Sequence, residues 1–406
     1  MLALSPAPDG TGAVPGRRVV ITGVGVVASC GIGAPQFWQG LMGEPPVARE
    51  RPVTGLDVGA LFGPKEARRA DPFLRMAIAA ADEAVRDAGG TDAFRGDPER
   101  AGSYFGTGVG GLETLCEQDR VFMQKGARSV SPFLVPAMMC NRAAAEVSMR
   151  FGLRGPCECT VTACASGTQS IANAARLIAT GRADVMVAGG SEAPLCELGV
   201  AGFANMTALS RSGVSMPFDV ARDGFVIGEG AGALVLEERS RALARGAHVY
   251  AEVTGAASTA DAHHITAPAP DGSGAARCME LALLDAQLSA DEVAHINSHG
   301  TSTPPGDLAE AEAIHKVFGW PGPPVTSIKG MIGHTLAAAG AIEAVAVALS
   351  IEHRLIPPTA GTKNVDPACG LDVVLDNPRE WAPGPVVSNS FGFGGHNGSL
   401  VISPPA

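Results

Sequence analysis

Short β-branched runs alternate with helical segments along almost the whole chain, and this alternation constrains the fold more than any other feature. Residues 17–28 are typical of a buried strand, and residues 70–90 of a helix that Asp71 can cap with Pro72 in its first turn. Similar strand and helix patterns follow one another on both sides of about residue 250. The sequence therefore predicts an α/β fold with two similar layered halves.

No clear linker separates the two halves, so we expect one compact body. Residues 336–353 form a helical pattern that is apolar nearly all round, which is typical of a helix buried between sheets. We divide the chain into a flexible N-terminal tail at 1–16, an N-terminal half at 17–250 and a C-terminal half at 251–406.

The composition excludes several classes of protein. The net charge is −11 over 406 residues, which argues against a general nucleic-acid binder. There is no run of about 18 apolar residues, so we expect no membrane span. The first sixteen residues lack the basic start and apolar core of a signal peptide, and the nine cysteines show no disulfide framework. We therefore expect reduced thiols and a cytoplasmic protein.

Two motifs are similar to binding sites, and we interpret both as structural. The glycines of "GVGVVA" at 23–28 match a weak dinucleotide fingerprint, but no acidic residue clearly ends a second strand about twenty positions later. We predict a tight glycine turn there. Cys157 and Cys159 are close together, but no second Cys/His pair lies at ligand spacing. We predict buried thiols there and no metal site.

A cysteine walled by small residues stands at the start of a predicted helix in "VTACASGTQSIANAARLIATG", residues 161–181. Apolar residues recur at helical spacing from Ile171 to Ile178, so Cys164 lies at or just before the first turn. At that position the helix dipole lowers a thiol pKa, and free backbone N–H groups can hold an oxyanion. We predict that Cys164 is a nucleophile; the alternative is a buried structural cysteine.

Two later histidines are candidate partners for this thiol. His299 follows a predicted strand, and Lys329 and His334 lie in a glycine-rich loop between a predicted strand and a helix. Open α/β sheets gather their sites at such strand ends. Two histidines can stabilise an enolate or move a proton, and the helix N-terminus would keep His334 neutral. A structural role is the alternative, and a metal is disfavoured because the two histidines are not at local ligand spacing.

The last glycine-rich loop, "SNSFGFGGHNGS", places Phe391 and Phe393 among four glycines. Such a backbone is mobile or closely packed, and an aromatic side chain within it can act as a gate. The alternative is a plain β-turn before the last strand, and both interpretations are compatible.

Together these segments resemble the β-ketoacyl-acyl carrier protein synthases of the thiolase superfamily, most of all the elongating enzymes of bacterial type II fatty acid synthesis. The similarity runs in order from about Arg17 to Ser403 and includes "VTACASGT", "VMVAGGSEAP", "RDGFVIGEGAGALVLE", "NSHGTSTPPGD", "SIKGMIGHTLAAAGAIE" and "SNSFGFGGHNGS". The resemblance implies a thiolase-like five-layered αβαβα fold with two pseudo-symmetric halves, and a dimer. It implies an acyltransferase that performs a decarboxylative Claisen condensation of an acyl thioester on Cys164 with malonyl-acyl carrier protein, in fatty acid elongation.

The resemblance also implies the roles of individual residues. His299 and His334 would promote decarboxylation and stabilise the enolate, with Lys329 as the lysine of the site and Glu343 as its buried acidic partner. The backbone N–H groups of Cys164 and of the gating aromatic Phe393 would form the oxyanion hole. Thr301 and Thr303 would contact the phosphopantetheine. Val109 and Phe203 would line the acyl pocket. No metal and no cofactor is implied beyond the phosphopantetheine that carries the substrates.

The resemblance places the carrier protein against a basic segment. Lys65, Arg68 and Arg69 would face this acidic partner, with Lys125 and Arg128 as further basic groups. The alternative is a solvated helix face with no partner. We expect no nucleic-acid or membrane partner.

The chain departs from the family pattern at three places, of which Ser298, where alanine is more usual beside His299, is a small change. Only "RSGVSM", residues 211–216, stands where the family has a longer, Arg-bearing loop, which puts one carrier contact in doubt. Val109 is smaller than the usual isoleucine, which would deepen the acyl pocket.

The shortened loop leaves two pathways open. The first is a homodimer in fatty acid elongation, and the second is a polyketide ketosynthase subunit that pairs with a cysteine-less chain-length factor in a heterodimer. The intact set of Cys164, His299 and His334 disfavours a non-catalytic partner subunit. A thiolase is disfavoured because the last glycine loop has no second cysteine. The acyl chain that is preferred stays open.

Overall fold

The computed structural model describes residues 17–94 and 96–405. The flexible tail predicted at 1–16 lies outside these residues. Ten strands form one continuous path, in which two sets of five meet where β1 pairs with β9 over only two residue pairs, Val20 with Glu252 and Ile21 with Ala251.

The two sets of strands repeat one topology. The first set comprises β1 (Val19–Ala28), β4 (Ala101–Gly106), β5 (Cys157–Thr160), β6 (Val185–Glu192) and β8 (Gly230–Glu238). The second set comprises β9 (Ala251–Ala260), β10 (His295–Asn297), β11 (Val325–Thr326), β14 (Val386–Gly392) and β15 (His396–Ser403). Their spatial orders are β5-β4-β6-β8-β1 and β11-β10-β14-β15-β9, so each reads third, second, fourth, fifth, first in chain order.

Strand direction repeats as well. In each set the third, second and fourth strands are parallel, and the fifth pairs antiparallel with both the fourth and the first. The predicted two pseudo-symmetric halves are therefore confirmed. Residue 250 lies between the last element of one set and the first strand of the other, and the domain boundary itself stays a prediction.

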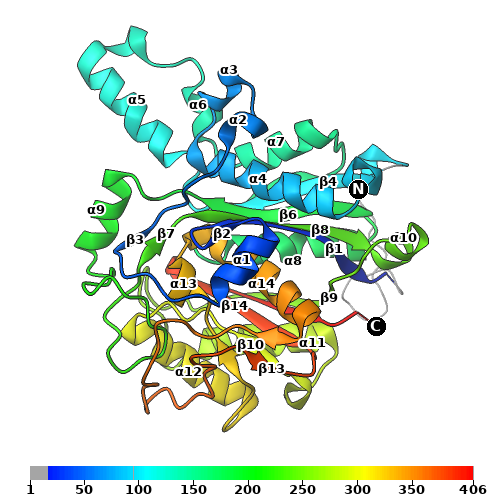
Figure 1. Cartoon of the computed structure of the whole chain (residues 1–406), viewed down its shortest axis with the longest axis vertical. Helices are drawn as coiled ribbons and strands as arrows, with labels where there is room; N and C mark the ends of the chain where they lie inside the picture. The colour runs from blue at the N-terminus through cyan, green and yellow to red at the C-terminus, as the bar shows by residue number, and fades with distance from the viewer. Residues whose placement is uncertain (1–16, 95, 406) are drawn as a thin grey trace.

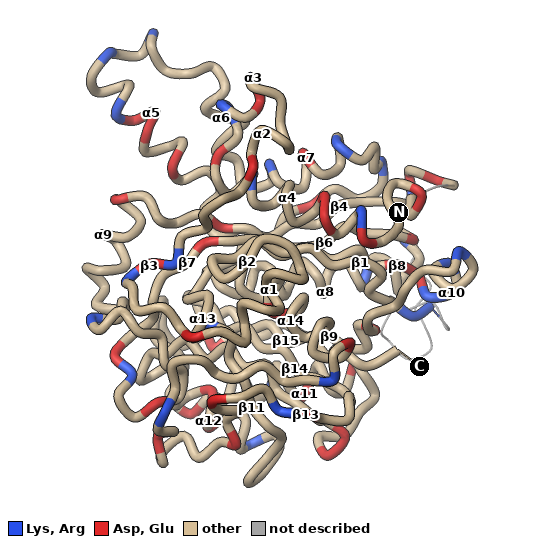
Figure 2. The backbone as a smooth tube through the Cα atoms, in the orientation of Figure 1, with Lys and Arg blue, Asp and Glu red and all other residues tan. Residues whose placement is uncertain are grey.

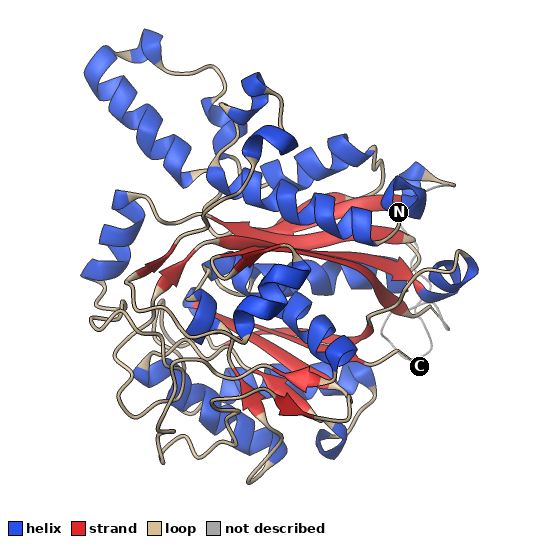
Figure 3. Cartoon of the chain, viewed as in Figure 1, coloured by secondary structure: helices blue, strands red, loops and turns tan. Residues whose placement is uncertain are grey.

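Helices cover both sets of strands and fill the space between them (Figures 1 and 3). One outer layer packs on the first set, a central pair contacts both sets, and a second outer layer packs on the second set. The three layers are α4 (Pro72–Asp87) with α7 (Arg142–Phe151), α8 (Ser166–Ala179) with α14 (Ala339–His353), and α11 (Ser273–Ala286) with α12 (Pro304–Phe318). This is the five-layered αβαβα arrangement that the sequence predicts.

The central helix α14 is buried from Ala339 to Ile351. The stretch 336–353 that contains it is the only described segment long and apolar enough to cross a bilayer, but 89% of it is buried inside the protein. Its apolar character is explained by the two layers of strands that enclose it, as expected.

The predicted glycine turn at 23–28 is wrong, because Gly23 and Gly25 lie inside β1. A Cβ atom at Gly25 would lie 2.0 Å from the carbonyl oxygen of Ala80 in α4, and one at Gly23 would lie 2.2 Å from that of Ala84. The glycines therefore allow the α4 backbone to pack directly on the strand.

Two further expectations need correction. Cys157 is exposed and Cys159 half-buried, not buried as predicted, because β5 pairs only with β4 among the described strands and forms an edge of the sheet. The sequence pattern over 136–152 also predicts one helix, but the structure has two: α6 (Leu134–Met138) ends at an extended Met139, and α7 begins after Asn141. Asparagine favours such helix starts over helix interiors.

The remaining elements are short or peripheral. Helix α5, with α2, α3 and α6, projects beyond the layers (Figure 1). Their bounds, with those of the other minor elements, are α1 (Ala34–Leu41), α2 (Val58–Leu61), α3 (Pro64–Ala67), α5 (Leu112–Lys125), α9 (Glu197–Asn205), α10 (Arg239–Ala244), α13 (Lys329–Ile332), β2 (Gly31–Ile32), β3 (Glu50–Arg51), β7 (Ile227–Gly228), β12 (Leu355–Ile356) and β13 (Arg379–Glu380).

Candidate active site

Cys164 occupies a tight turn between the end of β5 and the start of α8. Ala163 has a φ of 49°, and the Ser166 hydroxyl accepts a hydrogen bond from the Thr162 N–H at 2.9 Å while it donates to the Ala163 carbonyl at 2.6 Å. These bonds hold the cysteine just before the first turn of the helix, where the sequence places it. Its side chain is only 6% exposed.

Small residues let the backbone around Cys164 pack closely. A Cβ atom at Gly392 would lie 3.0 Å from the Cys164 backbone nitrogen, and one at Gly167 would lie 2.8 Å from the carbonyl oxygen of Ala337. The last glycine-rich loop therefore reaches the cysteine, and the start of α8 packs on the segment before α14. Bulkier residues would push the loops apart.

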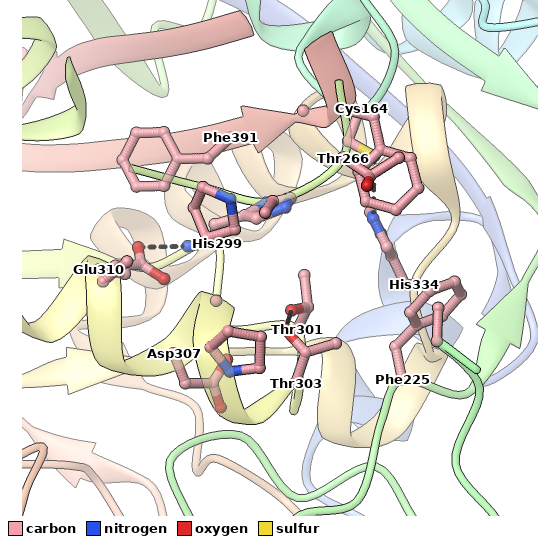
Figure 4. A pocket seen from close by; sticks show the side chains of 18 of the residues that line it. Cys164, Phe225, Thr266, His299, Thr301, Thr303, Asp307, Glu310, His334 and Phe391 are labelled. Carbon is pink, nitrogen blue, oxygen red and sulfur yellow. Dashed lines mark hydrogen bonds between the residues drawn. The ribbon is translucent and has the colours of Figure 1, made fainter. Parts of the chain in front are cut away.

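His334 reaches the thiol from the second half of the protein. The imidazole Nε2 lies 3.1 Å from Cys164 Sγ (Figure 4). The backbone N–H of His334 donates to the Val226 carbonyl at 2.7 Å. The two residues hold equivalent places, since each precedes the central helix that follows the third strand of its half. The repeated topology therefore brings the cysteine and this histidine together.

His299 completes the group from the loop after β10. Its ring and that of His334 have centroids 5.2 Å apart and an angle of 85° between their planes. The Glu310 carboxylate accepts hydrogen bonds from the backbone N–H groups of His299 and Gly300, each at 2.7 Å (Figure 4). Glu310 thereby fixes the loop that presents the imidazole.

Burial determines the protonation of the two histidines. It lowers the pKa of His299 and of His334 well below the usual value, and the nearby Lys329 ammonium lowers both further. Both imidazoles are therefore neutral at physiological pH, and each keeps one N–H that can donate to a substrate oxygen. The neutral state expected for His334 has burial as its main cause.

The position of Cys164 at a helix N-terminus predicts a lowered thiol pKa, but burial outweighs this effect. Burial raises the pKa of this thiol to about 12, although the Lys329 charge and the backbone N–H groups of Phe393 and of Cys164 itself act in the opposite direction. The resting group is a neutral thiol beside a neutral imidazole. Nucleophilic attack therefore requires that the thiol proton leaves, and His334 Nε2 is the nearest base.

Lys329 is completely buried and donates to the Glu343 carboxylate in α14. Burial raises the pKa of Glu343, and the Lys329 charge opposes this rise. The lysine therefore brings one positive charge close to the cysteine and both histidines. The Glu343 carboxylate of the central helix balances this charge.

A cavity of about 360 Å³ opens onto the three side chains, and its lining includes Phe203, Thr301, Thr303 and Phe393 (Figure 4). The hydroxyls of Thr301 and Thr303 are 2.9 Å apart. Val109 does not line this cavity and is 48% exposed. The structure thus brings together the predicted binding residues except Val109.

The glycine-rich loop that carries Phe393 is joined to the loop at 261–269. The Gly394 N–H donates to the Ile265 carbonyl at 2.7 Å, and the Asp261 N–H donates to the Gly395 carbonyl at 2.9 Å. Gly394 and Gly395 have φ values of 82° and 71°, which favour glycine. One wall of the cavity therefore consists of two backbone-paired loops.

Sequence reasoning named the buried Glu343 but missed three other buried carboxylates, Asp307, Glu310 and Glu192. Asp307 accepts the N–H groups of Phe218 and Ser302, and Glu192 accepts those of Gly108 and Val109. A signal was present in α12, because residues 307, 310, 311 and 314 lie at helical spacing and form its buried face. Carboxylates on such a face indicate that they order nearby loops.

The geometry also bears on a metal ion. One ligand atom from each of Cys164, His299 and His334 lies within 4.8 Å of the others, so distance in sequence was a poor argument against a metal. The charge of Lys329, which lowers the pKa of both histidines, disfavours a second cation at this place. That the site works without a metal stays a prediction.

The predicted docking residues Lys65, Arg68 and Arg69 are exposed in and after α3. The Arg69 guanidinium lies 3.7 Å from the centre of the Phe133 ring. Lys125 and Arg128 are exposed at the far end of α5, where Figure 2 shows basic groups on the projecting part. The basic groups therefore lie on or near the part that projects beyond the layers.

The shortened loop at 211–216 forms a compact turn. The Asp223 carboxylate accepts the N–H groups of Arg211 and Ser212 at 3.1 and 3.0 Å, and the Ser210 hydroxyl at 2.6 Å. Asp223 also lines the cavity. The shorter loop is therefore well ordered by its own hydrogen bonds.

Comparison with protein families gives two adjacent matches. Residues 57–242 match the model described as beta-ketoacyl synthase, N-terminal domain, and residues 250–363 match the model of its C-terminal domain.

Curated relatives match over nearly the whole chain. The chain is 42% identical to the 3-oxoacyl-[acyl-carrier-protein] synthase 2 of Synechocystis and 43% identical to that of Rhizobium meliloti. In each case the match covers 95% of this chain and 98% of the relative.

Solved structures match equally completely. A beta-ketoacyl synthase from Burkholderia phymatum is 35% identical with a TM-score of 0.88, and the ishigamide ketosynthase/chain length factor is 34% identical with a TM-score of 0.89. A type II polyketide ketosynthase in complex with its acyl-carrier protein, AntDE:AntF, is 33% identical with a TM-score of 0.86. Each match covers 96% of this chain and 100% of the other.

Proposed function

The chain belongs to the β-ketoacyl synthase family, and we propose that Cys164 carries the acyl group while His299 and His334 promote the condensation. The enzyme is an acyltransferase that forms a 3-oxoacyl thioester from an acyl thioester and a malonyl thioester. The observation that supports these roles best is the 3.1 Å approach of His334 Nε2 to Cys164 Sγ, with His299 in the same cavity.

In the first step Cys164 takes the acyl group. His334 Nε2 receives the thiol proton, Sγ attacks the acyl thioester carbonyl, and the carrier thiolate leaves and takes the proton back. The N–H groups of Cys164 and Phe393 already point to the sulfur, and they would donate to the carbonyl oxygen as it becomes negative. The neutral resting thiol makes this proton transfer necessary.

In the second step the malonyl thioester loses carbon dioxide. The electron pair of the broken bond moves into the thioester carbonyl and gives an enolate. Two neutral imidazoles that donate N–H groups to this oxygen stabilise the enolate without first being deprotonated. The burial of His299 and His334 and the Lys329 charge support this assignment, because they keep both rings neutral.

In the third step the enolate carbon attacks the acyl thioester on Cys164. The new carbon–carbon bond forms, the bond to Sγ breaks, and the product leaves as a 3-oxoacyl thioester that is two carbons longer. The same two backbone N–H groups serve the tetrahedral intermediate. Cys164 leaves as a thiolate and takes a proton from water for the next cycle.

We propose that acyl carrier protein delivers both substrates. Its phosphopantetheine would pass Thr301 and Thr303, whose hydroxyls lie together in the cavity, and Phe393 would act as the gate. Lys65, Arg68 and Arg69 would contact the acidic carrier. Changing Arg68 and Arg69 to Glu should raise KM for the carrier with little effect on kcat, whereas Arg154→Glu, at another exposed site, should not.

We propose a homodimer in which a second chain covers Val109 and completes the acyl pocket. Its support is the edge strand β5, which pairs only with β4 among the described strands, and the exposed apolar side chains of Val109, Met149 and Val161. Light scattering of the purified protein should give twice the 41.1 kDa chain mass. A monomer mass would contradict the homodimer, and would favour pairing with a different chain.

The pathway that we propose is fatty acid elongation in the cytoplasm. The curated relatives at 42–43% identity support it, and the nine free cysteines are in keeping with a reducing compartment. The alternative is a polyketide ketosynthase with a chain-length factor, which the compact loop at 211–216 leaves open.

The test combines purified enzyme with an acyl-carrier protein panel and labelled malonyl-carrier protein. A labelled product two carbons longer, together with release of carbon dioxide, is expected for at least one saturated acyl chain. If no acyl group gives either the labelled product or carbon dioxide, the proposed function is contradicted for the chain alone. Turnover that appears only with a co-expressed, cysteine-less partner would select the polyketide alternative.

A further inference from the structure

Two free cysteines outside the active site lie within reach of each other. Cys116 Sγ in α5 and Cys196 Sγ at the start of α9 are 3.9 Å apart, although they are 80 positions apart in the sequence. Both side chains are half-buried, so small molecules in solution can reach them. A disulfide has an S–S length of about 2 Å, so only a small approach separates this pair from a covalent bond.

The contact is part of a docked helix face. Leu112, Cys116 and Arg120 recur every fourth residue and therefore share one side of α5. The Arg120 guanidinium pairs with Glu197 at 2.9 Å, and a Cβ atom at Gly199 would lie 3.2 Å from the Leu112 side chain. Three consecutive turns of α5 thus meet the first turn of α9, with the two thiols in the middle.

Neither helix is anchored by a core of its own. No residue of α5 or α9 is buried, and α5 projects beyond the layers (Figure 1). Elements with so little buried surface open at low free energy cost. A covalent bond between them would therefore restrict a part of the protein that is otherwise loosely held.

Helix α9 also forms part of the cavity wall. Its residue Phe203 lines the cavity and packs edge-on against Phe225, which packs in turn against the His334 ring with centroids 5.3 Å apart. Cys196 stands at the start of this helix, two turns before Phe203. A bond at Cys196 would fix the start of the helix that carries this side chain.

We propose that Cys116 and Cys196 form a reversible disulfide by exchange with a small-molecule disulfide, and that this bond locks α9 against α5. In the first step Cys196, at the N-terminus of α9, is the attacking thiol and gives up its proton. Its sulfur attacks the small disulfide and releases one thiolate. Cys116 then attacks the Cys196 sulfur and releases the second, so that two protein thiols are oxidised, two small thiols form and both protons go to them.

The chemical test uses oxidised glutathione and the full-length protein. The expected result is loss of two alkylatable thiols per chain, a mass lower by two hydrogens and a linked peptide that contains Cys116 and Cys196. Reduction with dithiothreitol should restore both thiols. Cys116→Ser and Cys196→Ser should each abolish the linked peptide. The control is Cys140→Ser, which should leave the linked peptide unchanged, because Cys140 lies in a separate contact, with Cys159.

Amide hydrogen exchange tests the structural consequence. In the oxidised protein the amides of 197–205 should exchange more slowly than in the reduced protein, and Cys116→Ser should lose this difference. Stable glutathione adducts without a link, a link between other cysteines, or unchanged exchange in the linked protein would overturn the proposal. None of these readouts depends on the condensation activity.

Discussion

Cys164 and His334 are 170 positions apart in the sequence, yet Sγ and Nε2 are 3.1 Å apart in the structure. Each residue precedes the central helix of its half, and these helices, α8 and α14, pack on each other between the two sets of strands. The repeated topology is thus the physical cause of the active-site pair. The account of function depends on this relationship.

The roles of His299 and His334 should be distinguishable by how each substitution changes the acylation rate of Cys164. Replacing either His299 or His334 with Ala should lower condensation by ~10²–10⁴-fold, because each removes an N–H donor to the enolate. Only His334→Ala should also slow acylation of Cys164, since His334 accepts the thiol proton, and higher pH should restore part of that rate. Single-turnover acylation and product formation are measured side by side.

The control for this pair is His315→Ala, whose imidazole contacts the Cys369 carbonyl and does not line the cavity. It should keep both activities. Equal acylation rates in wild type and His334→Ala at neutral pH would contradict the role of His334 as the base.

Lys329→Met should move the acid limb of the pH–rate profile to higher pH. Burial lowers the pKa of His299 and His334, and the lysine charge lowers it further, so both stay neutral well below pH 6.5. Without that charge their pKa rises, and protonation removes activity at a higher pH than in wild type. Condensation is measured per folded protein, with near-ultraviolet circular dichroism at each pH.

The matched control is Lys363→Met, which removes an exposed lysine paired with Asp376. Its profile should follow that of wild type. An acid limb that stays in place, or moves to lower pH, in Lys329→Met would show that the lysine does not set the protonation of the histidines.

Glu192 should make stability depend on pH. Burial raises the pKa of this carboxyl from 4.5 to about 7, so the folded state holds its proton more firmly than the unfolded state. Its contribution is fully present below pH 4.5 and is lost as the pH rises through 7. The unfolding free energy of wild type minus that of Glu192→Gln, measured in urea, should therefore fall from pH 5 to pH 8. A value that rises with pH would contradict this.

Gly25→Ala should destabilise the fold by about 2 kcal/mol or more, because the added methyl group would meet the Ala80 carbonyl of α4 at 2.0 Å. Gly202→Ala in α9 is the control, since nothing lies within 4 Å of its added Cβ. It should be neutral or raise stability by about 0.5–1 kcal/mol. Urea unfolding of both variants compares them, and equal midpoints would contradict close packing at Gly25.

Local patterns were sufficient where neighbours in sequence determine the structure. Asp71 accepts the Phe73 N–H at the start of α4, with Pro72 in the first turn, as expected. Cys164 likewise stands just before its predicted helix. Helix α5 was missed because it buries no residue and so has no apolar stripe to detect.

Contacts between distant segments could not be predicted in this way. The role of Gly25 depends on the α4 backbone, and the approach of His334 to Cys164 joins residues 170 positions apart. The pKa of Cys164 also depends on burial, which outweighs the helix terminus that the sequence indicates. Motifs identified the side chains, and the topology determined their environment.

The most direct test of the account is the mass of the intact protein after incubation with acyl-carrier proteins of different chain length. Wild type should gain the mass of one acyl group, mapped to the peptide of Cys164, and Cys164→Ala should gain none while it unfolds at a similar temperature. Cys278→Ala, at another buried thiol, should be acylated like wild type. An acyl group that still appears on folded Cys164→Ala, or maps to another residue of wild type, would contradict the account.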